Sequence, residues 1–297
     1  MQESILRFFQ SIQSPFLDTL FTYVTMLGEQ YFIIIIVAWV YWNYSKKEGF
    51  ILTFLFLIST LVNSLMKVLF HTQRPFQKLD NFQGKRIFTA EGHSFPSGHT
   101  QGASTLFLSL AIIFKNRSYF YWAIFLSLSV AISRLYLGVH WPIDVIGGFV
   151  LACIIVFSLY GYMSKIYEKP ATFYRFIVIV LTFFYFILLI IIALNAFYIV
   201  EPIEIKNFLR LVGVATGAVS GFIFEEKKFP FSVDAHRLKK YLRFIIGMAG
   251  TLGLLVGLKY LLPENNFMVI IRYFLVGAWI SGIFPILGQK INLFARA

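Results

Sequence analysis

A series of long apolar runs constrains this chain more than any other feature. Nine runs lie near residues 30–45, 49–70, 98–114, 119–138, 143–163, 173–199, 207–224, 241–262 and 267–288. A helix of about 20 mainly apolar residues crosses the hydrocarbon core of a bilayer, so each run predicts a membrane span. Residues 14–27 form a shorter run, broken by Pro15 and Asp18, which is either a short first span or a helix in the membrane interface. The sequence therefore predicts an all-α, polytopic membrane helix bundle of nine or ten spans.

Composition supports a membrane protein over a soluble one. Apolar residues make up 58% of the 297 positions and charged residues 13%, whereas soluble domains average roughly 45–50% and 25%. A globule of this size would leave large apolar areas in water. Residues 1–13 lack the charged start, apolar stretch and cleavage site of a signal peptide. The single cysteine, Cys153, excludes a disulfide framework and a cysteine metal site.

The basic residues predict the topology of the chain. The net charge is +12, from 26 basic and 14 acidic residues. Cytoplasmic loops of membrane proteins are enriched in Lys and Arg, whereas loops 200–206 and 263–266 lean acidic and are predicted to face outward. Because the charges follow this rule, they do not indicate nucleic-acid binding. The residues assigned to the cytoplasmic side are Lys46, Lys47, Lys115, Arg117, Lys165, Lys169, Arg175, Lys227, Lys228, Arg237, Lys239, Lys240, Arg243, Lys290 and Arg296.

The predicted outward loop 71–95 departs from this rule. It carries Arg74, Lys78, Lys85 and Arg86. Three readings are open: the orientation is inverted, the loop is simply solvated, or its positive charge serves an anionic ligand. Because the charges of the other loops all indicate the same orientation, the sequence favours an anionic ligand as the reason for the basic residues of loop 71–95.

Three sequence blocks beside this loop hold most of the polar chemistry of the apolar core. All three fall at one predicted membrane face, where ionisable groups are functional by default. Isolated membrane histidines and arginines often only hydrogen-bond or snorkel, but three blocks on one side favour a site. The blocks are Lys67-x6-Arg74-Pro75, Pro96-Ser97-Gly98-His99 and Ser133-Arg134-x5-His140-x3-Asp144.

The blocks have the chemistry of a phosphate site. Lys67, Arg74 and Arg134 supply cations, and guanidinium forks match phosphate oxygens. Ser97 and Gly98 open a predicted helix, whose free N–H groups and positive dipole end favour an anion. Gly98 also lets this backbone approach a ligand closely.

The third block predicts an oriented imidazole. Pro142 suits the first turn of a helix, so Asp144 in that turn can reach back to His140. A carboxylate on one ring nitrogen fixes the tautomer and leaves the other nitrogen free to attack. His99, at the start of another helix, can protonate a departing oxygen.

Together the blocks resemble the tripartite signature of the type 2 phosphatidic acid phosphatase superfamily, and every signature position matches. The signature covers 67–144. The similar core covers about 1–165, which implies a six-helix phosphatase core followed by a four-helix membrane extension, 166–297, of unknown role. The resemblance implies that His140 is the nucleophile and forms a phosphohistidine, that His99 is the general acid, and that Asp144 orients His140. The residues that it implies for phosphate binding are Lys67, Arg74, Ser97, Gly98 and Arg134.

The resemblance also implies a reaction without a metal or another cofactor. The sequence agrees, because it shows no carboxylate cluster suited to Mg²⁺ and no His/Cys set suited to Zn²⁺. We therefore expect a multi-pass plasma-membrane lipid phosphatase with an extracytoplasmic active site. By resemblance, its substrate is a lipid phosphate or pyrophosphate: undecaprenyl pyrophosphate, phosphatidic acid or phosphatidylglycerol phosphate. Two alternatives stay open: a lipid phosphotransferase that uses the same site, and a lipid transporter with a vestigial site.

Further residues carry weaker expectations. Gly213, Gly217 and Gly221 are four apart, which predicts a helix face for close packing, either within the chain or in a homodimer. Arg210 and Arg272 lie near predicted outer helix ends, where they either snorkel or bind a second anionic part of the lipid. His71 and His93, in loop 71–95, are either ordinary loop residues or assist in headgroup binding.

Overall fold

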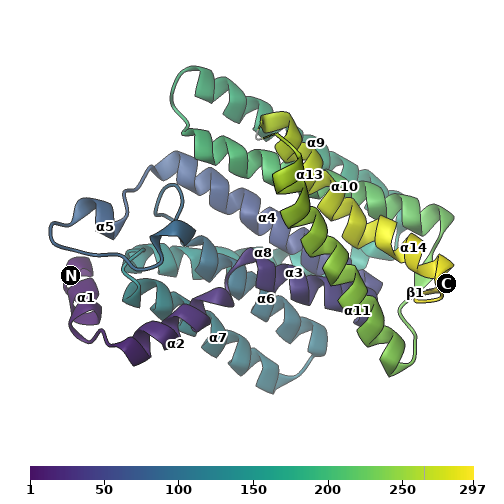
Figure 1. Ribbon diagram of the computed structural model, residues 1–297, viewed down its shortest axis with the longest axis horizontal. Coiled ribbons are helices and arrows are strands. Elements are labelled where there is room, and N and C mark those ends of the chain that lie inside the picture. The colour runs from purple at the N-terminus through teal and green to yellow at the C-terminus, as the bar shows by residue number, and fades with distance from the viewer. Residues whose placement is uncertain (264) are drawn as a thin grey trace. The chain divides into compact units, whose positions relative to one another are not determined.

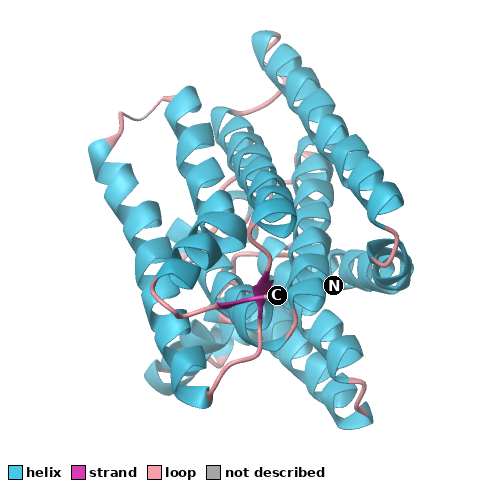
Figure 2. Ribbon diagram, turned by 90° about the vertical axis from the view of Figure 1, so that its right-hand side faces the viewer, coloured by secondary structure: helices cyan, strands magenta, loops and turns pink. Residues whose placement is uncertain are grey.

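The computed structural model describes residues 1–263 and 265–297 and is almost entirely helical (Figure 1). Glu264, within the predicted acidic loop 263–266, lies outside the described residues. One antiparallel pair, β1 (Phe231–Ser232) with β2 (Ala295–Arg296), is the only sheet in the described ranges and lies near the C-terminus (Figure 2). The all-α prediction is confirmed.

The structure identifies candidate spans by the length and hydropathy of its helices. Among the described residues, seven helical segments are long and apolar enough to cross a membrane, or eight if a bent pair is one span. The bent pair joins Pro15–Met26 to Gln30–Tyr44 at 48°, whereas the sequence counted the first arm as an optional tenth span. The run 98–114 forms a helix of only 17 residues, about 26 Å long at 1.5 Å per residue, which is shorter than a bilayer core of about 30 Å.

The chain divides into two compact units. The first unit comprises Met1–Ile34 and Phe54–Tyr162, and the second comprises Ile35–Thr53 and Met163–Ala297. The segment Ile35–Thr53 therefore packs with the C-terminal half of the chain, a pairing that the sequence did not predict.

The first unit contains the three signature blocks. Its helices begin where the sequence offers caps: Ser14 and Ser97 each accept a backbone N–H in the first turn of the helix that follows. The elements that lie wholly or mainly in this unit are α1 (Gln2–Ser11), α2 (Pro15–Met26), α4 (Lys46–Phe70), α5 (Pro75–Lys78), the 3₁₀ turn η2 (Ile87–Thr89), α6 (Gly98–Phe114), α7 (Arg117–Tyr136) and α8 (Pro142–Tyr167).

Helix α6 is the core of the first unit. Every residue from 100 to 109 is buried, and α6 packs along α7. Two glycines let other backbones approach its first turn. A Cβ at Gly148 would lie 2.7 Å from the Ser97 carbonyl oxygen, and one at Gly28 would lie 2.6 Å from the His99 carbonyl oxygen. Because real Cβ atoms do not come so close, these two glycines fix the position of the helix end that carries Ser97 and His99.

The second unit contains the C-terminal helices. Prolines at the first position begin α9 and α10, where the missing N–H costs no hydrogen bond. Beside the β1–β2 pair, its elements are the π-helical turn η1 (Val40–Tyr44), the second half of α3 (Gln30–Trp39), α9 (Pro170–Ala196), α10 (Pro202–Lys228), α11 (Arg237–Leu252), η3 (Gly253–Gly257), α12 (Leu258–Leu261), α13 (Asn266–Ala278), η4 (Trp279–Ile283) and α14 (Phe284–Lys290).

The glycine face predicted on α10 packs within the chain. Helix α10 lies along α13 and η4. A Cβ at Gly213 would lie 2.7 Å from the Ile270 carbonyl oxygen, and one at Gly217 would overlap the Phe274 carbonyl oxygen. Of the two predicted uses of this face, the structure therefore has the contact between helices of one chain. A homodimer through the same face would require this contact to open.

Two residues assigned to the cytoplasmic side form contacts with other segments of the chain. Lys46 forms ion pairs with Glu225 and Glu226 of α10. Arg243 is fully buried and donates hydrogen bonds to the carbonyl oxygens of Trp42 (2.8 Å) and Val233 (3.3 Å). These contacts explain why the segment around η1 belongs to the second unit.

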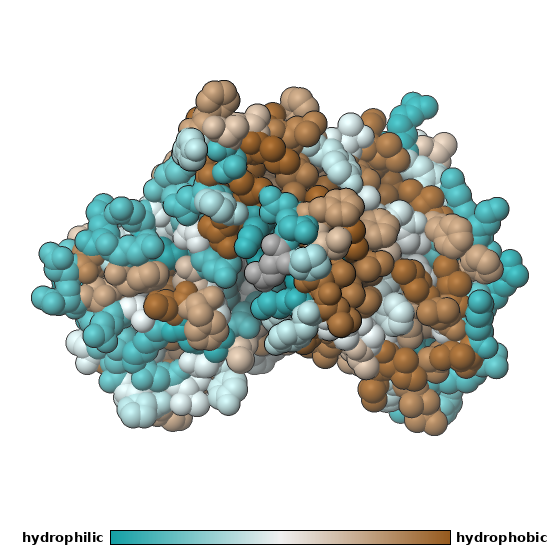
Figure 3. All heavy atoms as spheres, turned by 45° about the horizontal axis from the view of Figure 1, so that its top comes forward, coloured by the Kyte–Doolittle hydropathy of each residue, from teal (hydrophilic) through white to brown (hydrophobic). Residues whose placement is uncertain are grey.

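The surface carries broad apolar areas (Figure 3). One example is an exposed stripe on α8, in which apolar side chains recur every three or four residues and so share one helix face. A lipid environment accounts for an exposed apolar face of this kind. The stripe consists of Ile143, Ile146, Val150, Ile154 and Phe157.

Candidate active site

The candidate site lies in the first unit, where the C-terminal ends of α4 and α7 meet the N-terminal ends of α6 and α8. Hydrogen bonds tie these ends together: the Ser97 N–H donates to the Asp144 carbonyl oxygen (2.9 Å), and the Val139 N–H donates to the Arg134 carbonyl oxygen (3.3 Å). Residues from all three sequence blocks therefore converge at one place.

His140 is buried, with 2% exposure, and polar groups face both of its ring nitrogens. Nδ1 lies 3.3 Å from Oδ2 of Asp144, the contact predicted from the four-residue spacing. The same oxygen accepts hydrogen bonds from the hydroxyl of Ser94 (2.5 Å) and the Trp141 N–H (2.8 Å). Because Asp144 is itself held at two points, it fixes the ring orientation of His140.

Arg74 binds the other side of the ring. Its Nη1 lies 3.1 Å from Nε2 of His140 and donates to the Val139 carbonyl oxygen (2.9 Å). The remaining nitrogens donate to carbonyl oxygens of the loop before α6, at Glu91 and Gly92 (2.8 and 2.9 Å). Arg74 is thus a buried guanidinium that links loop 71–95 to His140.

Two more cations of the signature lie at the site. The Nζ of Lys67 donates to the Glu91 carbonyl oxygen (3.3 Å), the same oxygen that Arg74 contacts. Arg134 is fully buried and donates from Nη1 to the hydroxyl of Thr25 (2.9 Å). Its Nε and Nη2 make no hydrogen bond within the described part of the chain. Buried guanidinium nitrogens without a partner favour an anionic ligand.

The start of α6 has the features predicted for an anion site. Ser97 is the N-cap: its hydroxyl accepts from the Thr100 N–H at 3.4 Å. His99 follows in the first turn, and its buried Nε2 makes no hydrogen bond among residues 1–263 and 265–297. A Cβ at Gly98 would make only ordinary contact with Oδ1 of Asn63, at 3.4 Å. Because packing alone does not require glycine here, close approach of a ligand is the better reason for it.

A ladder of buried polar side chains positions α6 against α4. Asn63 donates to Gln101 (2.8 Å), Gln101 donates to the Ser59 carbonyl oxygen (2.9 Å), and the hydroxyl of Ser59 lies 2.9 Å from that of Thr105. Satisfied buried networks of this kind specify one packing arrangement. The ladder holds the helix start with Ser97 and His99 in register with Lys67.

The loop charges do not all serve a ligand, which corrects the expectation for loop 71–95. Lys85 forms an ion pair with Asp18 of α2 (2.5 Å), and Arg86 forms one with Glu29 (2.6 Å). Lys78 is exposed. Of the four basic residues, only Arg74 contacts His140.

Burial lowers the pKa of His140 well below its usual value, and the charges of Arg74, Arg134 and Lys67 lower it further. At neutral pH the imidazole is therefore uncharged. A neutral ring holds a lone pair on one nitrogen. Because Arg74 can only donate, its contact places that lone pair on Nε2 and the ring proton on Nδ1, beside Asp144.

The other loop histidines lie beside the site. The rings of His71 and His93 contact each other edge to face, with centroids 4.6 Å apart. The His93 carbonyl oxygen accepts a hydrogen bond from Arg74 (3.2 Å). His93 thus contributes a backbone contact to the site, whereas a role of either ring in headgroup binding stays a prediction.

Sequence reasoning missed three residues of the site: Ser94, Trp141 and Thr25. The Trp141 contact was predictable, because an acidic residue at the third helical position often accepts the N-cap N–H. Ser94 lies only three residues before Ser97, but nothing distinguishes it from other loop serines. Thr25 is 109 positions from Arg134, so no local pattern reveals the pair.

The donor chemistry of the site is that of an anion site. Within the residues that the structure describes, no group of three or more His, Cys, Asp or Glu side chains is arranged to hold a metal ion. The site instead combines a buried imidazole, one carboxylate and three cations.

Sequence comparisons decide the family. Residues 48–168 match the PAP2 superfamily, and residues 209–296 match the transmembrane extension of PAP2 superfamily phosphatases. The undecaprenyl-diphosphatase BcrC of Bacillus subtilis is 30% identical over 148 residues, which cover 49% of this chain and 75% of the relative. This chain belongs to the PAP2 superfamily. The resemblance seen in the three blocks is thereby confirmed, and the protein is an integral membrane phosphatase of this superfamily.

Other PAP2 phosphatases are similar over about half of the chain. The phosphatidylglycerophosphatase B of Bacillus subtilis is 30% identical over 168 residues, covering 52% of this chain and 79% of the relative. The crystal structure of a PAP2-type phosphatidylglycerolphosphate phosphatase from Bacillus subtilis is 26% identical and covers 56% of this chain and 85% of that chain, with a TM-score of 0.47. The family assignment rests on the sequence matches and does not depend on this structural similarity.

Proposed function

We propose that this PAP2 protein hydrolyses a lipid phosphate or pyrophosphate through a phosphohistidine on His140. The observation that carries the proposal is the environment of the His140 ring: Asp144 faces Nδ1, and Arg74 faces Nε2. A neutral imidazole with its proton held by a carboxylate is an activated nucleophile. A guanidinium beside the attacking nitrogen is placed to bind an oxygen of the phosphate.

In the first step, Nε2 of His140 attacks phosphorus and the bond from phosphorus to the leaving oxygen breaks. Arg134, Arg74 and Lys67 compensate the charge of the phosphate oxygens, and the N–H groups at Ser97 and Gly98 donate to them. Because His99 begins the same helix, it is the proposed donor of a proton to the leaving oxygen. The negative charge of the bound phosphate favours the protonated ring that this step needs. The products of this step are the dephosphorylated lipid and phosphorylated His140.

In the second step, water attacks the phosphohistidine. His99, which has lost its proton, accepts one from the water, and the nitrogen–phosphorus bond breaks. Inorganic phosphate leaves, and both histidines return to their starting states. Asp144 stabilises the positive ring of His140 that forms while its Nε2 carries the phosphoryl group.

The proposed substrates share a phosphate at the end of a lipid. Relatives are named undecaprenyl-diphosphatase and phosphatidylglycerophosphatase, which supports undecaprenyl pyrophosphate and phosphatidylglycerol phosphate, with phosphatidic acid as a third candidate. The tail would lie in the bilayer beside apolar helix faces such as the stripe on α8. No observation favours the phosphotransferase or the transporter over hydrolysis.

We also propose that the active site faces the extracytoplasmic side of the plasma membrane. The basic residues in the predicted cytoplasmic loops support this orientation. Cys153 is the only cysteine, so Cys153→Ser gives a cysteine-free background. In it, an impermeant maleimide added to intact cells should label Lys78→Cys beside the site but not Lys115→Cys, which follows the far end of α6. The reverse labelling would overturn the orientation.

The test of function is phosphate release by the full chain in detergent with EDTA present. The substrates are the three lipids and a water-soluble phosphate ester. His140→Ala should abolish release, whereas His236→Ala, which changes an exposed histidine of the second unit, should not. An alkaline quench should trap a phosphoryl group on His140 in the parent protein only.

Each outcome assigns a reaction. Inorganic phosphate identifies water as the acceptor, whereas a newly phosphorylated lipid would identify a phosphotransferase. Full activity of His140→Ala, or a phosphoryl group on another residue, would overturn the mechanism. Loss of activity in EDTA, restored by a divalent metal, would overturn the metal-independent reaction.

A further inference from the structure

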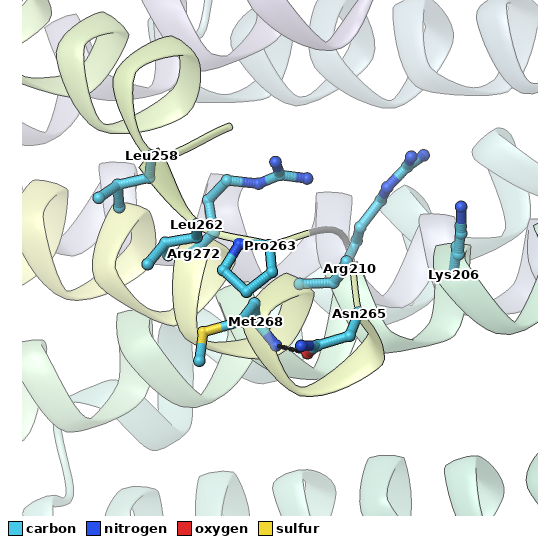
Figure 4. Close-up of a pocket in the computed structure, with 9 residues that line it drawn as sticks. Lys206, Arg210, Leu258, Leu262, Pro263, Asn265, Met268 and Arg272 are labelled. Atoms are coloured by element: carbon cyan, nitrogen blue, oxygen red, sulfur yellow. Dashed lines mark hydrogen bonds between the residues drawn. The ribbon is translucent and has the colours of Figure 1, made fainter. Parts of the chain in front are cut away.

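The second unit contains a basic pocket that the signature blocks do not explain. It lies where α10, α12 and α13 meet (Figure 4). Lys206, Arg210 and Arg272 line it, and Figure 4 shows their charged ends extending toward the same side. The sequence placed Lys206 in an outward loop, but it belongs to α10.

The two arginines of this pocket lie in the first few turns of their helices rather than at the helix ends. Arg210 is the ninth residue of α10 and Arg272 the seventh of α13. At 1.5 Å per residue they lie roughly 12 Å and 9 Å inside the helix ends. Because like charges that line one pocket repel each other, three cations at this place favour a bound anion between them.

The carboxylates that the structure describes do not neutralise all three of these basic residues. In the structure as described, neither Lys206 nor Arg272 forms an ion pair. Arg272 contacts the ring of Tyr273, 5.4 Å from its centroid, and Arg210 donates to Asn207 (3.2 Å). Snorkelling alone explains one arginine near a helix end. It does not explain three cations on two helices that line a single pocket.

Apart from Asn265, the rest of the lining is apolar. Leu258, Leu262, Met268 and Val269 contribute most of it. Next to them, Leu261 is 78% exposed. A free inorganic anion would contact only the basic part of the pocket. A lipid has a charged head that matches the basic part and an apolar tail that matches the apolar part.

We propose that this pocket binds the phosphate headgroup of an anionic lipid. Lys206, Arg210 and Arg272 contact the phosphate oxygens, and the start of the acyl or isoprenoid chain lies along Leu258, Leu262 and Met268. The site belongs wholly to the C-terminal extension, so it is separate from the residues proposed to carry out hydrolysis. It gives the extension a lipid-binding role.

The experiment measures binding of dioctanoyl phosphatidylglycerol to the full chain in neutral detergent by native mass spectrometry. All variants carry His140→Ala, so no phosphoryl transfer occurs. The lipid is a phosphodiester, which sets it apart from the proposed substrates. Inorganic phosphate tests whether the ligand is the free anion, and dioctanoyl phosphatidylcholine tests whether the net negative charge is needed.

Arg272→Gln should weaken binding about tenfold or more, since each hydrogen bond between charged groups has an effect of that size. Lys206→Gln tests the same pocket with an exposed residue whose loss should leave the fold intact. Arg175→Gln is the matched control, because it removes an exposed arginine of the same unit that does not line the pocket.

The proposal requires selective binding of the anionic lipid that both pocket variants weaken and the control does not. Equal binding of the zwitterionic lipid would overturn it. Displacement of the lipid by inorganic phosphate at a similar concentration would overturn the lipid assignment and leave a free-anion site. Unchanged affinity in Lys206→Gln and Arg272→Gln would overturn the site itself. Since His140→Ala is present throughout, these outcomes are independent of the proposed hydrolysis.

Discussion

Nη1 of Arg74 lies 3.1 Å from Nε2 of His140, although the two residues are 66 positions apart in the sequence. Because a guanidinium can only donate, this contact is a hydrogen bond only while Nε2 carries a lone pair. The arginine therefore selects the uncharged ring, with the lone pair on Nε2, the nitrogen proposed to attack phosphorus. When substrate binds, the same guanidinium would exchange that nitrogen for a phosphate oxygen.

The first prediction concerns pH. Burial, followed by the charge of Arg74, lowers the pKa of His140, so this proposed nucleophile stays unprotonated until the pH falls below the ordinary range of histidine. Activity should be lost as the pH falls through this lowered pKa. Arg74→Gln removes a cation and raises the pKa. The acidic limb of kcat/KM should therefore move to higher pH, in addition to an overall loss of about 100-fold from phosphate binding.

Lys67→Gln is the control for this profile. Lys67 lowers the pKa of His140 less than Arg74 does, so its removal should move the acidic limb less. An acidic limb that stays in place in Arg74→Gln would show that a group other than His140 controls the profile.

The second prediction concerns Ser94. Its hydroxyl donates to Asp144 at 2.5 Å, within a fully buried site. Ser94→Ala removes one of the two contacts that hold this oxygen, which should lower kcat about 10-fold to 100-fold with little change in KM. Ser104→Ala is the matched control, because Ser104 is equally buried and its hydroxyl makes no hydrogen bond in the described chain. Equal effects of the two variants would contradict a positioning role for Ser94.

The sequence predicted the site better than the surroundings of the site, and the reason is physical. The reach from Asp144 to His140 follows from helix geometry across four residues, and the cap at Ser97 follows from local hydrogen bonding. Contacts such as Arg134 with Thr25 depend on how helices pack, which no local pattern encodes. The prediction that loop charges serve a ligand failed at Lys85 and Arg86 because their partners lie on distant segments.

Packing also explains what the sequence missed in the fold. Apolar runs predicted most of the helices, because their length and hydropathy are local properties. The association of Ile35–Thr53 with the second unit involves contacts between distant residues, such as the hydrogen bond from Arg243 to Trp42, 201 positions apart. The bend near Gly28 could not be predicted from the sequence either, since the backbone of His99, far along the chain, lies close to Gly28.

The third prediction concerns the loop cations. Lys85 is paired with Asp18, and both side chains are about one-third exposed. Lys85→Gln should therefore change kcat/KM less than about threefold, because exposed ion pairs contribute little. Arg134→Gln is the contrast, and it should lower kcat/KM about 100-fold or more through lost phosphate contacts. Steady-state kinetics on one lipid substrate measures both variants. A large loss of kcat/KM in Lys85→Gln would instead support the first expectation, that the positive charge of loop 71–95 serves an anionic ligand.

The last prediction concerns the packing of α10 against α13. A Cβ at Gly217 would overlap the Phe274 carbonyl oxygen, which belongs to backbone and cannot move aside. Gly217→Ala should therefore force the helices apart and lower the thermal unfolding temperature in detergent by several degrees, since overpacking costs about 1–3 kcal/mol. Gly253→Ala is the control: a Cβ there meets nothing within 4 Å, and alanine is the better helix former. It should leave the unfolding temperature unchanged or raise it. If Gly217→Ala were as stable as Gly253→Ala, α10 and α13 would not be packed backbone to backbone.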